Sequence, residues 1–183
     1  MVEVADRIHT TPNKVCYWLK KYEIPRRSWS ESSYVKQNPN GDPFKVKENL
    51  SDREKEILIA GLMLFLGEGG RRNKHSIQLG NLNPEVIQIF IEFLRKICRV
   101  KEDKIKLSVR LHKKFSKPKA RTYWSKTLGI PKQQVLIYDH YDSRSKLNRQ
   151  HSEYGLATLI FSNMKLKKWL DDKIKEQIQK LVK

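Results

Sequence analysis

The feature of this sequence that most constrains its fold is an apolar run over residues 57–66 that stops on Gly-Glu-Gly-Gly at residues 67–70. Ser51 and Glu54 precede the run at the spacing of a capping box, which predicts a helix that begins next to Ser51. The glycines predict its end, so Glu68 stands where the buried part of the helix stops. Two interpretations follow: a solvated acid behind a glycine cap, and a metal-binding carboxylate at the foot of a helix pair.

The charge of the chain predicts a polyanionic partner. The 38 Lys and Arg against 20 Asp and Glu give a formal net charge of +18, and such an excess repels itself unless a polyanion neutralises it. Nucleic acid is therefore the predicted partner. The apolar run 57–66 is too short to cross a bilayer and the chain opens without a targeting signal, so we expect a soluble, cytoplasmic protein with no membrane partner.

The sequence lacks the motifs of several other classes of functional site. Ser-His-Asp, Walker and dinucleotide-binding patterns are absent from it, so we expect no small-molecule substrate. Cys16 and Cys98 are far apart and have no His or Cys partner at the spacing of metal ligands. His140 and His151 also lack such spacing, and no role is predicted for them.

Turn-forming pairs divide the chain. Asn-Pro, Asn-Gly and Asp-Pro pairs cluster within residues 38–43, and such pairs favour an irregular connection. A chain of 183 residues is long enough for one core and a small accessory module. We therefore predict a small helical unit over residues 1–27, a linker over residues 28–50 and a larger domain over residues 51–183.

The unit predicted over residues 1–27 has the pattern of two short helices around a tight turn. Thr11 suits the N-cap of the second helix and Pro12 its first position. The pair resembles a helix-turn-helix, whose second helix enters the DNA major groove, although any small helical hairpin has similar spacing. The usual first supporting helix is missing, so the unit must borrow packing from elsewhere. The residues predicted to contact DNA are Asn13, Lys14, Tyr17, Lys20, Arg26 and Arg27.

Helix and strand patterns alternate after residue 70. Their order predicts an α+β domain whose helices lie on one face of a mostly antiparallel sheet, so that the other face is free to meet a duplex. The strand patterns cover residues 75–81, 104–114, 133–141 and 155–163, and the helix patterns cover residues 84–98, 120–129 and 165–182.

The clearest strand covers residues 104–114, where apolar and polar residues alternate. The alternation predicts one face on the helices and one face in contact with solvent or with phosphate. Residues 101–127 contain ten Lys or Arg and two acids, and this excess favours phosphate contact over a merely solvated face. The predicted contact residues on this strand are Lys106, Arg110 and His112.

The stretch ILIAGLMLFLGEGG, residues 57–70, resembles the signature helix of the LAGLIDADG homing endonucleases in the Gly-Glu-Gly variant of its ending. Downstream, IQLGNLNPEVIQIFIEFL, RTYWSKTLGIP and EYGLATLIFSNMKLKKWL are similar to later segments of single-motif members. The resemblance implies a LAGLIDADG-type domain, in which a curved antiparallel sheet straddles DNA and two motif helices pack together at its centre. In single-motif chains it implies a homodimer that hydrolyses double-stranded DNA at specific sites with a divalent metal.

The resemblance also implies roles for residues of the motif. Glu68 aligns with the final acid of the motif, which implies a catalytic carboxylate that binds Mg²⁺ together with the backbone carbonyl of Gly67. Hard cations of this kind take carboxylate and phosphate oxygens and activate water. Gly67 and Gly69 remove side chains beside Glu68, so that a partner helix and a DNA strand can approach. The residues implied at the interface between two copies are Ala60, Gly61, Leu64 and Gly67, although the bulky Met63 lies on the same helix.

Basic and polar residues directly after the motif are further candidates for DNA contact. Four of them can touch the phosphate backbone or polarise the attacking water, and a fifth, on the following strand, can read a base edge. In chain order they are Arg71, Arg72, Lys74, His75 and Gln78. The main alternative is a non-cleaving DNA-binding regulator on the same fold, with the helix-turn-helix supplying specificity, and a third possibility is binding to structured RNA.

Overall fold

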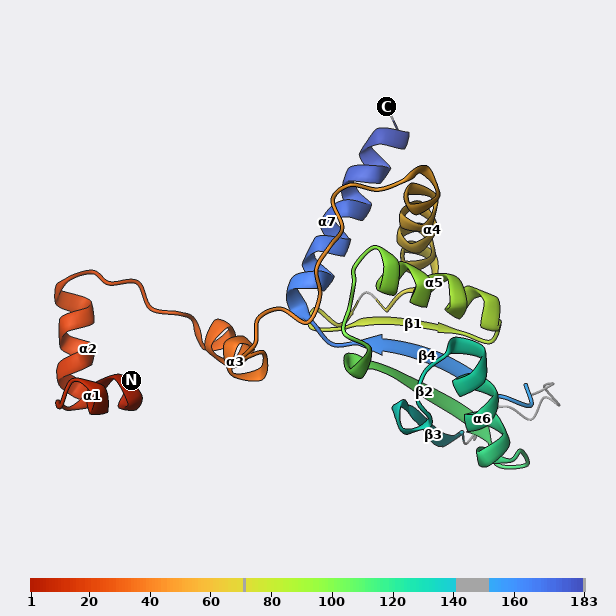
Figure 1. Cartoon of the computed structure of the whole chain (residues 1–183), viewed down its shortest axis with the longest axis horizontal. Helices are drawn as coiled ribbons and strands as arrows, with labels where there is room; N and C mark the ends of the chain where they lie inside the picture. Colours follow the sequence, from red (N-terminus) through yellow and green to blue (C-terminus); the bar gives the residue numbers. More distant parts are fainter. Residues whose placement is uncertain (71, 141–151, 183) are drawn as a thin grey trace. The chain divides into compact units, whose positions relative to one another are not determined.

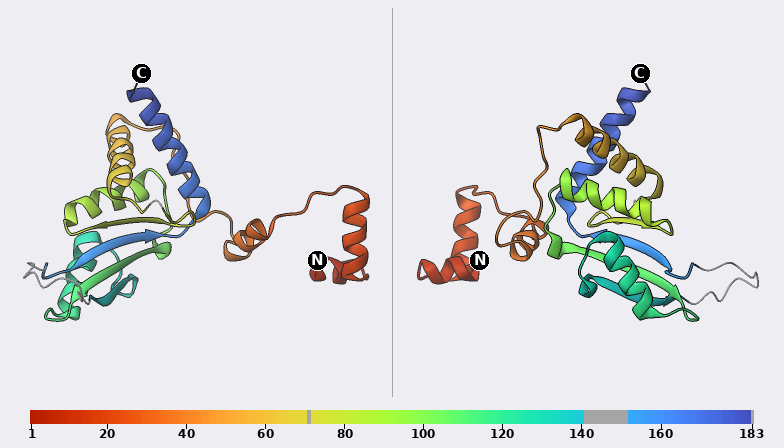
Figure 2. Two further views of the ribbon diagram at one scale, coloured as in Figure 1. Left: turned by 180° about the vertical axis from the view of Figure 1, so that it is seen from behind. Right: turned by 45° about the vertical axis from the view of Figure 1, so that its right-hand side comes forward.

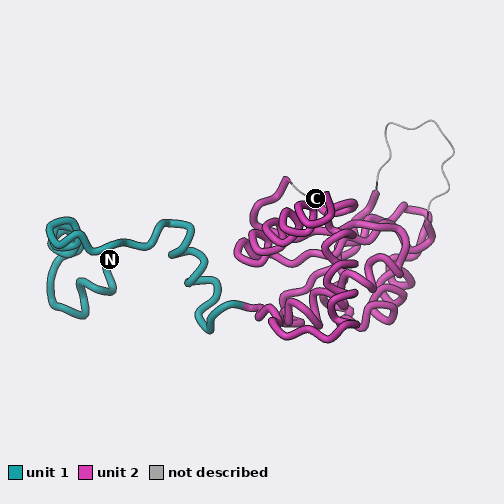
Figure 3. The backbone as a smooth tube through the Cα atoms, turned by 90° about the horizontal axis from the view of Figure 1, so that it is seen from above, with its two compact units in different colours: residues 1–42 teal, residues 43–183 magenta. Residues whose placement is uncertain are grey.

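The chain forms two compact units. The computed structural model describes residues 1–70, 72–140 and 152–182, and the units are Met1–Asp42 and Pro43–Lys183 (Figure 3). Of the helices in the described ranges, none has both the length and the apolar character needed to span a membrane. The boundary between the units falls inside the segment predicted to be a linker.

The smaller unit contains three short helices. The second begins as predicted, because the hydroxyl of Thr11 accepts a hydrogen bond from the backbone N–H of Lys14 at 3.4 Å and Pro12 lies in the first turn. The third lies within the predicted linker and starts with a capping box between Ser28 and Glu31. The helices are α1 (Val2–Arg7), α2 (Pro12–Lys21) and α3 (Trp29–Gln37).

Residues 43–50, the rest of the predicted linker, belong to the larger unit. The backbone N–H of Lys45 donates to the carbonyl of Cys98 at 3.0 Å, and the N–H of Lys47 donates to the carbonyl of Ile97 at 2.8 Å. Apolar side chains of this segment pack against the core of the larger unit. The structured domain therefore begins eight residues before the predicted start.

The larger unit is built on a four-stranded sheet in the order β1-β4-β2-β3 (Figure 1). β4 runs antiparallel to β1 and to β2, as predicted, whereas β3 runs parallel to β2. The parallel pair arises because a helix carries the chain from the end of β2 back to the start of β3. The prediction of an antiparallel sheet is wrong at this edge. The strands are β1 (Ile77–Asn81), β2 (Ile105–His112), β3 (Val135–His140) and β4 (Leu156–Phe161).

Helices pack on one face of the sheet and make the domain α+β, as predicted. Figures 1 and 2 show α4, α5 and α7 on the same side of the strands. The inward residues of β2 are buried in alternation with outward polar residues, and they join one hydrophobic cluster with side chains from the four α-helices that the structure describes in this unit. These helices are α4 (Asp52–Glu68), α5 (Pro84–Lys96), α6 (Lys117–Leu128) and α7 (Met164–Leu181).

The start of α4 is fixed by the predicted capping box. The backbone N–H of Glu54 donates to the hydroxyl of Ser51 at 3.3 Å, and the N–H of Ser51 donates to the Glu54 carboxylate at 2.9 Å. The ammonium group of Lys47 donates to the same carboxylate at 2.5 and 2.7 Å. The hydrogen bond from Lys47, followed by that from Ser51, lowers the pKa of Glu54 from 4.5 to about 2.

A depressed pKa in the folded state predicts a specific pH dependence of stability. The ionised Glu54 stabilises the fold fully above pH 4.5, and this stabilisation is lost as the pH falls towards about 2. We expect Glu54→Gln to lower the urea midpoint at pH 7, with a difference from wild type that shrinks between these two pH values. Glu92→Gln, which breaks only the exposed pair with Lys96, should have little effect. Equal midpoints for wild type and Glu54→Gln at pH 7 would contradict the expectation.

Candidate nucleic-acid interface and metal site

The sheet face opposite the helices carries the outward side chains of all four strands. We call it the open sheet face. Lys106, Arg110 and Tyr138 are exposed on it, and Tyr138 reaches 53% exposure. The strand register arranges the face in four successive rows. They are Gln78, Ile160 and Lys106; Gly80, Thr158, Ser108 and Leu136; Leu156, Arg110 and Tyr138; and His112 with His140.

The open sheet face is basic along β2 but mixed elsewhere. Lys106, Arg110 and His112 lie on it, as predicted from the alternation of the strand. β3 and β4 contribute mainly apolar and aromatic side chains to the same face. A face of this composition can meet phosphates along β2 and apolar base edges, such as the thymine methyl group, along its neighbours.

Glu68 is the last residue of α4, and its side chain is exposed. The backbone N–H of Gly69 donates to the carbonyl of Phe65 at 3.0 Å, and the N–H of Gly70 donates to the carbonyl of Gln78 at 2.8 Å. Gly69 also pairs with Leu79 as an isolated antiparallel bridge. The chain therefore leaves α4 along the edge of β1, and these main-chain bonds attach the residue after Glu68 to the strand that carries Gln78.

The two glycines beside Glu68 have different surroundings. A Cβ atom on Gly69 would lie 2.3 Å from the carbonyl oxygen of Phe65 and 2.5 Å from its ring, whereas a Cβ atom on Gly67 would meet nothing within 4 Å. Gly69 therefore makes room for Phe65 of its own chain rather than for a partner. Gly67 is exposed and leaves open space beside the end of α4.

A pocket of about 460 Å³ opens directly after Glu68. It is lined by Gly69, Gly70, Arg72, Asn73 and Gln78. Two residues predicted to contact DNA, Arg72 and Gln78, are thus brought together at the C-terminal end of α4. Lys74 and His75 are exposed in the connection that follows, and Arg71 lies outside the described residues.

The donors at the end of α4 suit a hard divalent cation. Glu68 offers an exposed carboxylate, and the last carbonyls of a helix, of which Gly67 carries one, have no intrahelical partner. Oxygen donors of this kind fit Mg²⁺, and the C-terminal end of the helix dipole favours a cation. In the part of the chain that the structure describes, no three His, Cys, Asp or Glu side chains gather as a metal site. A cation at Glu68 would therefore draw its other ligands from water, from phosphate or from a second chain.

The predicted interface between two copies is only partly exposed. Gly61 is buried, and a Cβ atom placed on it would lie 2.2 Å from the Cγ atom of Phe93 in α5. Gly61 therefore admits the Phe93 ring of its own chain. Ala60 and Leu64 are half-buried and Gly67 is exposed. The outward side of α4 also carries Ile59, which is 50% exposed, and the half-buried Met63.

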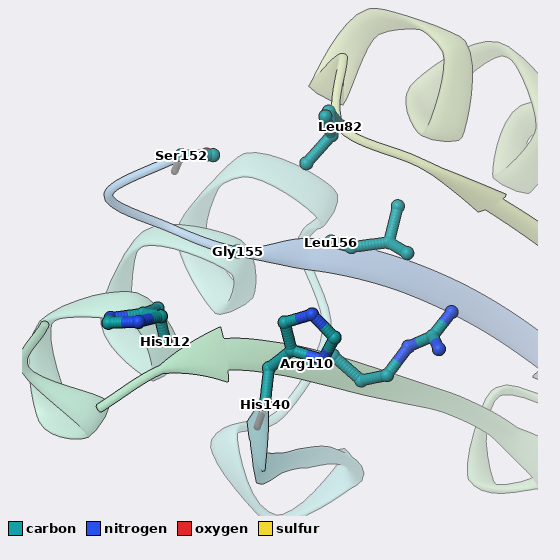
Figure 4. A pocket seen from close by; sticks show the side chains of 7 residues that line it. All are labelled: Leu82, Arg110, His112, His140, Ser152, Gly155 and Leu156. Atoms are coloured by element: carbon teal, nitrogen blue, oxygen red, sulfur yellow. The ribbon is translucent and has the colours of Figure 1, made fainter. Parts of the chain in front are cut away.

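A second hollow, of about 150 Å³, lies at the other end of the open sheet face (Figure 4). It brings together Arg110 and His112, both predicted to contact DNA, with His140, for which no role was predicted. The parallel pairing of β2 and β3 sets His112 and His140 side by side in register. The sequence signal that could have identified His140 is the alternation of residues 136, 138 and 140 along β3, which places these three residues on one face of the sheet. The remaining lining residues are Leu82, Ser152, Gly155 and Leu156, and His151 lies outside the described residues.

The residues predicted to contact DNA in the smaller unit are exposed along and after α2. They are Asn13, Lys14, Tyr17, Lys20, Arg26 and Arg27. The ammonium group of Lys21 lies 5.8 Å from the ring centroids of both Tyr17 and Tyr22. Residues 1–42 contain seven Lys or Arg against five acids, whereas residues 43–183 contain 31 against 15. The positive charge of the chain is therefore concentrated in the larger unit.

Comparisons of the chain with protein-family models, with curated proteins and with solved structures gave no match. The functional assignment therefore depends on the geometry at the end of α4, on the open sheet face and on the resemblance of residues 57–70 to the LAGLIDADG motif.

Proposed function

We propose that this protein is a metal-dependent endonuclease of the LAGLIDADG type that cleaves double-stranded DNA as a homodimer. The observation that carries the proposal is the position of Glu68. Its carboxylate is exposed at the end of an apolar helix, and the next two residues of the chain line a pocket together with Arg72 and Gln78. A carboxylate repels phosphate, so this position favours a cation between the two rather than DNA binding alone.

DNA binding is assigned to the larger unit, which holds most of the positive charge. Lys106 and Arg110 are exposed on the open sheet face, where they can neutralise phosphates. Gln78 lies in the same row of the sheet as Lys106 and can donate to and accept from a base edge. Gln78 also lines the pocket next to Glu68, so base reading and chemistry would occur close together.

The chemistry at Glu68 follows from its donors. Glu68 and the carbonyl of Gly67 would hold the divalent cation, which neutralises phosphate charge and lowers the pKa of a bound water when present. Arg72 lines the adjoining pocket, where its guanidinium can stabilise negative charge that develops on the phosphate oxygens. The exposed position of Glu68 keeps the carboxylate accessible to a DNA backbone.

A second copy would pack on the outward side of α4. Ile59 is 50% exposed there, and Gly67 leaves open space at the end of the same side. A glycine at a contact between two helices has no side chain, so the two helices can approach closely there. Such a pairing would bring the two Glu68 residues together, so that each chain supplies one carboxylate to the centre.

The smaller unit supports one alternative, a DNA-binding regulator that does not cleave. α2 exposes Lys14, Tyr17 and Lys20 on one short helix, which is the arrangement of a helix that enters the major groove. In the endonuclease this unit would extend the contact with DNA. In the regulator it would provide the sequence specificity, and Glu68 would have no chemical role.

Electrophoresis of a plasmid library with random inserts separates the two functions. We expect the purified full-length protein with Mg²⁺ to produce discrete fragments, and without metal to retard the same DNA. The complex should have the mass of two chains per duplex in light scattering. Retardation without fragments at any divalent metal would favour the regulator, and tighter binding to structured RNA than to duplex DNA at equal salt would exclude both.

A further inference from the structure

The hollow at the far end of the open sheet face has the composition of an anion site. Arg110, His112 and His140 line it from the adjacent strands β2 and β3 (Figure 4). Ser152, which follows the undescribed segment, adds a hydroxyl group. The volume of about 150 Å³ exceeds the roughly 30 Å³ that one water molecule occupies in the liquid, so it can admit a phosphate group.

Among the residues that the structure describes, the other charged groups near the hollow do not neutralise this cluster. Asp139 alternates with His140 along β3, so it belongs to the opposite sheet face, and its carboxylate pairs with the ammonium group of Lys117 at 2.8 Å. Glu153 lines a different pocket, with Tyr123 and Tyr154. Lys113 and Lys114 follow β2 directly and are exposed. The charged or titratable side chains that line the hollow, within the described ranges, are therefore positive or can become so.

The two imidazoles of the hollow come from neighbouring positions of adjacent strands. His112 and His140 are register partners, and parallel strands lie only about 4.8 Å apart, so two imidazolium groups would repel each other and Arg110. In addition, Nδ1 of His112 accepts a weak hydrogen bond, at 3.4 Å, from the backbone N–H of Lys114. This contact requires an Nδ1 atom without a proton. A bound phosphate would favour the protonated imidazoles, because a protonated imidazole donates a hydrogen bond from both nitrogens.

We propose that this hollow binds a backbone phosphate of duplex DNA and that binding is accompanied by proton uptake at His112 and His140. The inference rests on the proposed function, since it assumes duplex DNA on the open sheet face. Lys106 and His112 are six residues apart on β2, which is about 20 Å along a strand. The hollow therefore contacts a different part of the DNA backbone from the one at Glu68, and it contributes to affinity rather than to chemistry.

The test uses the full-length protein, a generic 24-base-pair duplex and the double variant His112→Gln/His140→Gln. We expect wild-type affinity at fixed salt to rise about tenfold between pH 8 and pH 6, as for a charge-assisted hydrogen bond. Calorimetry in two buffers of different ionisation enthalpy should show proton uptake on binding. The double variant, checked by thermal unfolding, should show neither effect. His9→Asn removes a histidine of the smaller unit where φ is +51°, a conformation that Asn tolerates, and should keep both effects.

The outcomes distinguish this inference from the proposed function. Duplex binding with the same pH dependence and proton uptake in wild type and double variant would overturn the inference and leave the proposed function standing. Absence of duplex binding by wild type at every pH would overturn both. Inorganic phosphate alone tests whether the hollow binds free phosphate instead of a phosphate of the DNA backbone. If it protonates the two histidines, followed by NMR of their imidazole resonances, while duplex DNA does not, the hollow binds free phosphate and the inference is wrong.

Discussion

Replacing Glu68 with glutamine is expected to lower magnesium-dependent cleavage of duplex DNA by about a thousandfold. The amide keeps the shape of the side chain but loses the anionic oxygen that holds the cation, and a bound metal supplies several kcal/mol of transition-state stabilisation. Affinity for DNA should be unchanged or slightly higher, because one negative charge beside the phosphates is removed. Cleavage is measured under single turnover on a site selected from the library, and affinity by fluorescence anisotropy without metal.

Glu48→Gln is the matched control for this variant. Glu48 is an exposed acid that precedes α4 and does not line the pocket next to Glu68, so cleavage should stay at the wild-type rate. Thermal unfolding establishes first that both variants are folded. Cleavage by Glu68→Gln at the wild-type rate would remove the central argument for the proposed function.

Replacing Gly61 with valine is expected to lower the free energy of unfolding by about 3 kcal/mol, the upper end of the range for overpacking. The Cβ position of Gly61 lies 2.2 Å from Cγ and 2.7 Å from Cβ of Phe93, and these atoms are at the base of a buried ring that cannot turn away. The helix or the ring must therefore shift. Urea unfolding at one fixed protein concentration measures the effect.

The same substitution at Gly67 is the control, because its Cβ would meet nothing within 4 Å. Valine is a somewhat better helix former than glycine, so Gly67→Val, at a protein concentration at which the chain is monomeric, should leave the free energy of unfolding within about 0.5 kcal/mol of wild type or raise it. Phe93→Ala should partly relieve the strain of Gly61→Val, so that the double variant is more stable than the sum of the single effects. Additive losses would show that Gly61 does not pack on Phe93.

Local signals predicted the element starts and the alternation of β2. The Ser51 and Glu54 capping box and the Thr11 cap depend on groups three residues apart, so the sequence contains both partners. The burial pattern of β2 follows from a period of two that nothing interrupts. The capping box that starts α3 offered a signal of the same kind, but it lay among turn-forming pairs that favoured a linker.

Long-range pairing and helix orientation could not be read in the same way. Alternation in β3 is compatible with either strand direction, so neither the parallel pairing nor the meeting of His112 and His140 followed from it. The run 57–66 is apolar on all sides, and without a polar face its periodicity does not tell which side meets the core. Gly61 and Gly67 therefore looked equivalent in sequence, although only Gly61 is buried against α5.

The hydrogen bond between the Gly70 N–H and the Gln78 carbonyl, at 2.8 Å, joins the end of α4 to β1 through main-chain atoms alone. Substitution of the Gln78 side chain leaves both partners of this bond in place. Under the proposed function, target preference can change through side chains of the open sheet face while the cut keeps its distance from the recognised base pairs. Side chains would then determine which new targets can evolve. Peptide groups would keep the cleavage position constant.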